Sequence, residues 1–222
     1  MATKFFKIIT LGLCAIAITS KVSATLDTEE LRLLLSDSGR DVSDFVRDSV
    51  RKPIEVLAFA GIDKGMSVLD LYAAGGYYTF ILSKAVGDTG TVYAQNTERG
   101  LRFVEDRQNR TQGKALKEKI EEGNLKNVVQ LIGPIRSLSL AEESLDAVML
   151  AQTLHDSYNS NPDRALNLLQ RLKTLLKPGG FIVITDHIGI SGSNNREIHR
   201  MEISQAIDVA EQAGFSVESS DL

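Results

Sequence analysis

The chain is short of the residues that build disulfides and aromatic surfaces. Its 222 residues include one cysteine, Cys14, and no tryptophan. A single cysteine excludes an internal disulfide, so core packing must stabilise the fold. Without tryptophan there is no strong stacking platform for nucleic-acid bases. The formal charge of −4 also argues against nucleic acid as the main partner, because phosphate binding needs a basic face.

The remaining composition is that of an ordinary globular protein. Hydrophobic residues make up 43% of the chain and charged residues 24%. This is enough for one sizeable domain with a buried core, and too little for two substantial domains. No internal repeat or low-complexity tract interrupts the sequence.

The first 24 residues have the pattern of a secretory signal peptide. Lys4 and Lys7 precede the apolar run 8–18, and the small residues of 22–24 resemble a cleavage site. The run is too short for a comfortable membrane span. We therefore predict cleavage after Ala24 and export, to the periplasm in a bacterium. An uncleaved N-terminal anchor is the alternative.

The stretch 67–79 organises the rest of the chain. A short apolar run ending at Leu71 predicts a buried strand, Gly75 and Gly76 follow, and the apolar spacing of 77–86 predicts a helix. Glycines let a ligand approach the backbone, and a new helix offers free N–H groups to it. The pattern is typical of nucleotide-binding α/β folds. A tight turn without a ligand is the alternative.

Apolar strands alternate with helices along the whole chain. We expect strands at 66–71, 91–96, 127–132, 145–151, 181–185 and 215–218. We expect helices at 28–35, 44–59, 97–122, 162–176 and 197–213, the second interrupted by Pro53 and the third near Gly113. This alternation predicts a parallel sheet with helices on both faces.

Histidine and aspartate side chains gather where the predicted strands end. His155 and Asp156 follow strand 145–151, Asp186 and His187 follow strand 181–185, and His199 comes soon after. The carboxyl ends of parallel strands share one edge, where ligands bind. A histidine there can accept a proton near neutral pH. Each of the histidines could instead be structural.

A row of basic residues on the second helix could meet an anionic substrate. Arg47, Arg51 and Lys52 lie at helical spacing. Such a row usually forms a solvated face. The alternative is a row that overhangs the site and binds an acidic small molecule.

The order of elements and three motifs resemble class I S-adenosylmethionine-dependent methyltransferases. The motifs are V-L-D-L…G-G-Y-Y-T, V-Y-A-Q-N and L-K-P-G-G-F-I-V-I-T-D. The chain is also similar to a narrower group of exported bacterial predicted methyltransferases, through R-K-P-I-E-V-L-A-F-A-G-I, L-H-D-S-Y-N, D-H-I-G-I-S-G-S…I-H-R and E-Q-A-G-F. The resemblance implies an α/β, Rossmann-like class I methyltransferase fold with a mostly parallel sheet. It divides the chain into the signal peptide 1–24, N-terminal helices 25–60 and the Rossmann-like domain 61–222.

The resemblance also implies a cofactor site for S-adenosyl-L-methionine. Its methionine end would lie near the first turn, its ribose at the end of strand 91–96 and its adenine beyond strand 127–132. The implied cofactor-binding residues are Asp70, Tyr72, Ala74, Gly75, Gly76, Tyr77, Asn96 and Gly133.

Four positions depart from the class pattern. Tyr72 and Ala74 replace glycines, Asn96 replaces the acidic residue that holds the ribose, and Pro134 follows Gly133 where an acidic residue often meets the adenine. These departures predict weak or altered cofactor binding.

The predicted activity is methyl transfer to a small-molecule or envelope substrate. His155, Asp156 and His187 are the implied catalytic residues, with His155 as general base and Asp156 orienting it or the substrate. A divalent metal held by Asp156, Asp186 and His187 or His155 is an alternative. A non-catalytic binding protein on the same scaffold is another.

The end of the chain also departs from the class fold. The class ends with an antiparallel strand pair, and we expect this pair to be incomplete here, either because the protein is naturally short or because the sequence is truncated at Leu222. We therefore expect strand 181–185 to have an exposed edge.

Overall fold

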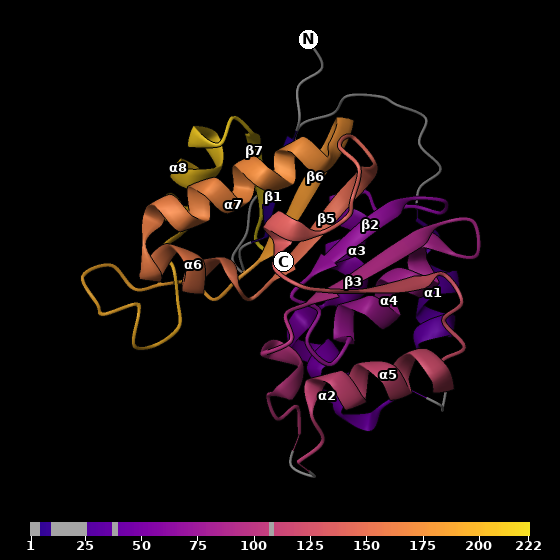
Figure 1. The fold of residues 1–222 in the computed structure, drawn as a ribbon. Helices are drawn as coiled ribbons and strands as arrows, with labels where there is room; N and C mark the ends of the chain where they lie inside the picture. Colours follow the sequence, from indigo (N-terminus) through magenta and orange to yellow (C-terminus); the bar gives the residue numbers. More distant parts are fainter. Residues whose placement is uncertain (1–4, 10–25, 37–39, 107–108) are drawn as a thin grey trace. The chain divides into compact units, whose positions relative to one another are not determined.

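A computed structural model describes residues 5–9, 26–36, 40–106 and 109–222, and of residues 5–9 it gives the backbone. The described chain divides into two compact units (Figure 1). One unit comprises residues 19–139. The other comprises residues 1–18 with 140–222. The predicted signal peptide and the predicted boundary at residue 60 stay predictions.

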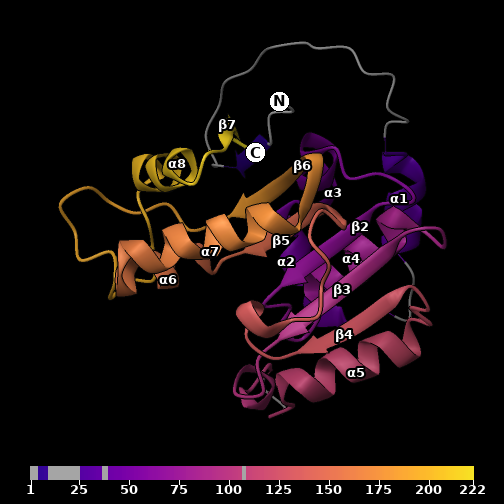
Figure 2. The ribbon, with the colours of Figure 1, turned by 45° about the horizontal axis from the view of Figure 1, so that its top comes forward.

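The unit of residues 19–139 contains three parallel strands in the order β4-β3-β2. The strands are β2 (Ser67–Leu71), β3 (Thr91–Asn96) and β4 (Val128–Ile132). The helices are α1 (Thr28–Leu35), α2 (Val42–Arg51), α3 (Pro53–Ala60), α4 (Tyr77–Val86) and α5 (Gln112–Glu122), with short 3-10 turns η1 (Gly100–Arg102) and η2 (Ile135–Ser137). In Figure 2, α5 lies beside β4. Leu116 and Ile120 of α5 belong to an apolar cluster with Ala94 and Val128.

Two of the helices predicted for this unit are interrupted or shortened, and in each case nearby residues explain why. The predicted helix 44–59 is two helices, because Lys52 adopts a left-handed conformation and Pro53 begins α3. The predicted helix 97–122 was wrong over its first half, where the described residues form η1 and irregular chain. Helix α5 begins at Gln112, after Thr111 caps it by accepting a hydrogen bond from the Lys114 N–H.

Helix α2 turns its charged face inward and its apolar face outward. Val42, Val46 and Val50 are 76%, 70% and 69% exposed, whereas Asp44 is 1% exposed. The Asp44 carboxylate pairs with Lys119 of α5, and the Asp48 carboxylate accepts the Tyr77 hydroxyl at 2.7 Å. Ion pairs and hydrogen bonds therefore hold α2 in its unit.

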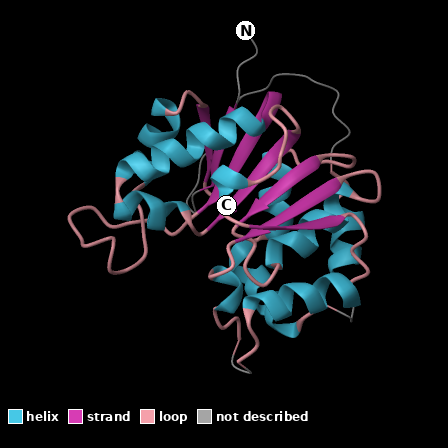
Figure 3. Ribbon diagram, viewed as in Figure 1, coloured by secondary structure: helices cyan, strands magenta, loops and turns pink. Residues whose placement is uncertain are grey.

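The other unit contains four parallel strands in the order β5-β6-β1-β7. The strands are β1 (Phe5–Ile9), β5 (Leu145–Ala151), β6 (Leu176–Thr185) and β7 (Ser216–Ser220). The helices are α6 (Leu154–Ser160), α7 (Pro162–Leu175) and α8 (Ile203–Gln212). Figure 3 shows helices beside the strands of this unit, and Leu168, Leu169, Leu172 and Leu175 form the buried stripe of α7.

Strand β1 comes from the segment predicted to be a signal peptide. Its backbone pairs with β6 on one side and with β7 on the other, parallel to both. The sequence F-F-K-I-I is rich in aromatic and β-branched residues, which favour strands. The expected exposed edge of strand 181–185 was therefore wrong, because β6 has a neighbour on each side.

Each unit has the strand–helix alternation and the parallel pairing that the sequence predicts, and the α/β Rossmann-like fold class is confirmed. Among the described helices, none is both long enough and apolar enough to cross a membrane.

Candidate active site

The turn after β2 keeps the backbone of a glycine-rich loop although two of its residues are not glycine. Tyr72 and Ala74 have φ values of 56° and 51°, and Gly76 has 85°. Left-handed conformations cost a non-glycine residue roughly 1–2 kcal/mol. Helix α4 begins after Gly76 with no side-chain cap. The first turn of such a helix is suited to binding an anionic group of a ligand.

Two amide side chains at the end of β3 hold this turn in place. Asn96 accepts a hydrogen bond from the Ala74 N–H at 3.0 Å and donates to the Ala74 carbonyl at 3.2 Å. Gln95 accepts from the Tyr72 N–H at 3.0 Å and donates to the Gly133 carbonyl at 2.7 Å. Both side chains are buried. Asn96, which we expected at the ribose, thus uses both its amide oxygen and its amide nitrogen to hydrogen-bond the turn.

Side chains of the same unit lie against Gly75 and Gly76, where a ligand would contact the turn. A Cβ atom placed on Gly75 would lie 2.5 Å from the carboxyl carbon of Glu105, and one on Gly76 would lie 2.7 Å from a Leu116 methyl. The Glu105 carboxylate accepts a hydrogen bond from Arg47 at 2.9 Å. The turn was predicted to hold the methionine end of S-adenosylmethionine, and this stays a prediction. A ligand that touches Gly75 requires Glu105 to move.

Two further predicted cofactor residues are buried and bonded within the unit. The Asp70 carboxylate accepts the Thr79 hydroxyl at 2.6 Å, and burial raises its pKa to about 7. The Tyr77 ring lies below the Arg51 guanidinium, 4.6 Å from its centroid. Burial and the hydrogen bond to Asp48 raise the pKa of the Tyr77 hydroxyl. Asp70 therefore supports the turn from inside the core.

In the other unit, His155 is fixed by the carboxylate of Asp186. The Asp186 Oδ1 lies 2.6 Å from His155 Nδ1, and Oδ2 accepts the His155 backbone N–H at 3.0 Å. The His155 side chain is 4% exposed. Burial opposes a charge on this imidazole, but the hydrogen bond and the charges of Asp186 and Asp156 raise its pKa overall.

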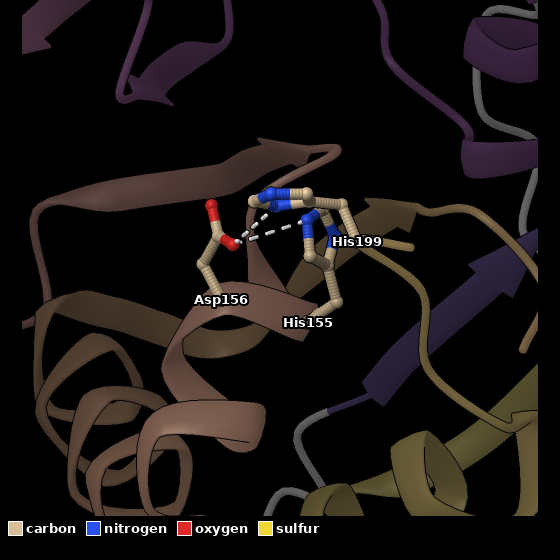
Figure 4. Close-up of side chains that lie close together, drawn as sticks. All are labelled: His155, Asp156 and His199. Atoms are coloured by element: carbon tan, nitrogen blue, oxygen red, sulfur yellow. Dashed lines mark hydrogen bonds and ion pairs between the residues drawn. The ribbon is translucent and has the colours of Figure 1, made fainter. Parts of the chain in front are cut away.

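Asp156 and His199 complete a cluster around the second nitrogen of His155 (Figure 4). The Asp156 Oδ1 lies 3.3 Å from His155 Nε2 and 3.1 Å from His199 Nδ1. The His155 and His199 rings meet edge to face, with centroids 5.7 Å apart. His199 lies in a loop before α8, so its predicted place on a helix was wrong.

His187 lies at the margin of this cluster. Its ring centroid is 6.4 Å from that of His155. Its backbone N–H donates to Asp186 Oδ1 at 2.8 Å. The predicted residues thus fall into two groups. The cofactor residues lie in the unit 19–139, and His155, Asp156 and His187 lie together in the unit containing 140–222.

Sequence reasoning missed three residues that shape these groups. Glu105 lay in a predicted helix, Gln95 was read as part of a strand, and Asp186 was considered as a metal ligand and not as the partner of His155. Gln95 offered a signal, because an amide inside an apolar strand needs buried hydrogen-bond partners. No local pattern could have placed Glu105 against Gly75, since they are thirty positions apart.

Arg47 was predicted either to be solvated or to clamp an anionic substrate. Its guanidinium instead pairs with Glu105 and, at 3.5 Å, with Asp44. An anionic acceptor would have to displace these carboxylates.

The fold and the turn define a class I methyltransferase of the S-adenosylmethionine-dependent type. The family model described as Methyltransferase domain matches residues 62–214. The chain therefore belongs to this family, which confirms the predicted superfamily.

Solved structures agree with this assignment. A SAM-dependent methyltransferase from Aquifex aeolicus superposes with a TM-score of 0.59 and 26% identity, over 85% of this chain and 88% of its own. An arsenic(III) S-adenosylmethionine methyltransferase from Chlamydomonas reinhardtii, at 20% identity and a TM-score of 0.53, covers 69% of this chain and 52% of its own, and shows the shared fold alone.

Two curated relatives are named demethylmenaquinone methyltransferases. The relative from Lactococcus lactis subsp. lactis (strain IL1403) is 34% identical over 54% of this chain and 41% of its own length. The relative from Staphylococcus aureus (strain MRSA252) is 33% identical over 58% of this chain and 46% of its own. The chain thus matches less than half of each relative.

Proposed function

We propose that this protein is an S-adenosylmethionine-dependent methyltransferase that acts on a small molecule with an ionisable proton. Family membership and the strand–turn–helix at β2 and α4 support the cofactor. The bound cofactor supplies a methyl group on a positively charged sulfur. The net negative charge of the chain supports a small acceptor over nucleic acid.

The unit 19–139 provides the cofactor contacts in this proposal. The turn between β2 and α4 binds the methionine end through backbone groups, with Asp70 and Asn96 bracing it. Gly133, with a φ of 141°, lets the chain turn after β4 beside the adenine. The residues assigned to the cofactor are Asp70, Tyr72, Ala74, Gly75, Gly76, Tyr77, Asn96 and Gly133.

His155 is the general base in this proposal. The observation that carries the role is the 2.6 Å hydrogen bond from its Nδ1 to Asp186. With the proton held on Nδ1, the lone pair of Nε2 is free to take a proton from the acceptor. Asp156 then stabilises the imidazolium, and His187 helps to place Asp186 through its backbone N–H.

The acceptor is a small molecule in this proposal. The curated relatives are named for demethylmenaquinone, so a quinol-like acceptor with an acidic ring hydroxyl is the first compound class to test. An anionic acceptor, a substrate of the cell envelope and an exported, periplasmic location also stay proposals. The pairing of β1 with β6 and β7 weighs against routine removal of residues 1–24.

Two observations favour a second candidate, a binding protein on a methyltransferase scaffold. The Asn96 amide is engaged by Ala74, and Glu105 lies against Gly75. Both would weaken cofactor binding.

Calorimetry of the full chain with S-adenosylmethionine and S-adenosylhomocysteine separates the two candidates. Binding of both compounds supports the methyltransferase, and absence of binding overturns it. A His155→Ala variant should then bind the cofactor as tightly as the wild type and lose transfer of a labelled methyl group. Unchanged transfer would remove His155 from its role.

A further inference from the structure

Three side chains of the unit containing 140–222 present nitrogen and oxygen atoms to one point in space. The atoms are Nε2 of His155, Oδ1 of Asp156 and Nδ1 of His199, and they lie within 4.8 Å of one another. We propose that they bind a divalent transition-metal cation of the Zn²⁺ or Co²⁺ type. Two imidazoles and one carboxylate suit such ions, whereas Mg²⁺ prefers oxygen ligands throughout.

The surroundings of His155 are those of a metal ligand. The hydrogen bond of Nδ1 to Asp186 fixes the ring and leaves Nε2 as the coordinating atom. Metal-bound histidines commonly have a carboxylate on their other nitrogen, which raises their basicity. Asp186 is itself largely buried, and it also accepts the backbone N–H groups of His155 and His187. The orientation of the first ligand is thus built into the fold.

His199 is held towards the same point by its own loop. Its backbone has a φ of 50°, which is strained for a histidine. The next residue, Arg200, is fixed on both sides: its carbonyl accepts from the Asn159 amide at 2.8 Å, and its guanidinium donates to the Ile188 carbonyl at 2.9 Å. A residue in a strained conformation beside a fixed neighbour is often found at a functional site.

One side of the cluster is open to a further ligand. Asp156 and His199 line an open hollow together with Asn159, Ser160, Asn194, Arg196 and Glu197. Three protein ligands with an open position are the arrangement of catalytic metal sites. An acceptor hydroxyl bound to the cation would lose its proton to water more readily. His155 would then coordinate the cation, and no base would be needed from it. This role for the cation rests on the proposed methyl transfer.

The cation site itself can be tested without any acceptor. Metal-stripped full-length protein is titrated with Co²⁺, followed by its visible absorption, and with Zn²⁺ by calorimetry, with Mg²⁺ in parallel. One Co²⁺ or Zn²⁺ should bind per chain, and Mg²⁺ should not. Asp156→Ala and His199→Ala should each weaken binding by about tenfold or more. Both side chains are exposed, so the variants are expected to fold.

His187→Ala is the matched control, because it removes the histidine of the chain that is not a proposed ligand and leaves the three proposed ligands in place. Its affinity for Co²⁺ should equal that of the wild type. Absence of binding, unchanged binding in His199→Ala and Asp156→Ala, or its loss in His187→Ala would overturn the site. S-adenosylmethionine binding is measured on the same samples. Cofactor binding without Co²⁺ binding refutes the metal site alone, and the reverse refutes the proposed methyl transfer alone.

Discussion

Asp186 and His155 are joined by two hydrogen bonds, one to the ring and one to the backbone, at 2.6 and 3.0 Å. The pair links the start of α6 to the end of β6. One carboxylate therefore positions both the helix and the imidazole that it carries. Because Asp186 occupies Nδ1, the chemistry of His155 is confined to Nε2, beside Asp156 and His199.

Replacing Asp186 with asparagine should lower the pKa of His155. The loss of the negative charge and of the charge-assisted hydrogen bond removes the two largest interactions that raise it, and leaves the smaller effect of Asp156. Methyl transfer should rise with pH in the wild type as His155 becomes neutral. In Asp186→Asn the midpoint should move to lower pH, and the rate should fall by about 10²-fold or more. Histidine titration by NMR and the pH profile of kcat test these two effects.

The same pair also gives a pH dependence to stability. A raised pKa in the folded chain means that the pair stabilises the fold fully below the ordinary histidine value of 6.5. This contribution is lost as pH rises through the folded value. Both this prediction and the preceding one would be contradicted if the pKa of His155 were the same in Asp186→Asn as in the wild type.

Removing the Glu105 side chain should tighten binding of S-adenosylmethionine. The carboxyl group lies where a ligand would touch Gly75, and it is held there by Arg47. Glu105→Ala clears that space, so the affinity measured by calorimetry should increase several-fold. Glu98→Ala, an exposed residue before the same loop, is the control and should leave the affinity unchanged. Weaker binding in Glu105→Ala would show that the carboxylate contacts the ligand.

Strands with continuous apolar runs could be predicted from the sequence. The predicted bounds 91–96 and 145–151 are those of β3 and β5, because both runs are largely buried and are followed by a polar residue, Thr97 and Gln152. Helix α6 was missed, since its seven residues are mostly polar and carry no apolar period. The start of α8 was placed six residues too early, because residues 197–202 lie in the loop before it.

Long-range pairing is the part that sequence patterns could not supply. The histidines and aspartates at the ends of β5 and β6 were expected together, since parallel strands share an edge. Which carboxylate would orient His155 depended on the register of β6, and Asp186 was found instead of Asp156. The inverted face of α2 likewise depends on Lys119, seventy-five positions away from Asp44.

Asp70→Asn should change how stability depends on pH. Burial raises the pKa of Asp70 from 3.8 to about 7, so the folded chain binds a proton that the unfolded chain releases. The wild type should therefore lose stability as pH rises from about 4 to 7, even though Lys119 favours the charge. The variant should lack this loss, which is at most about 4 kcal/mol.

Chemical denaturation at several pH values measures this difference. Thr79 can still donate its hydroxyl to an asparagine carbonyl, so the variant is expected to fold. Parallel stability curves for the two proteins between pH 4 and 8 would mean that Asp70 stays charged in the core.

Ala74→Gly should be tolerated or stabilising, unlike most changes from alanine to glycine. Ala74 has a φ of 51°, so glycine relieves a strain of about 1–2 kcal/mol. Greater freedom of the unfolded chain offsets about 0.5–1 kcal/mol of that gain. Ala58→Gly is the matched control, because Ala58 is exposed within α3 and should lose about 1 kcal/mol. Denaturation midpoints compare the two variants, and an equal loss in both would mean that the turn after β2 is not strained at Ala74.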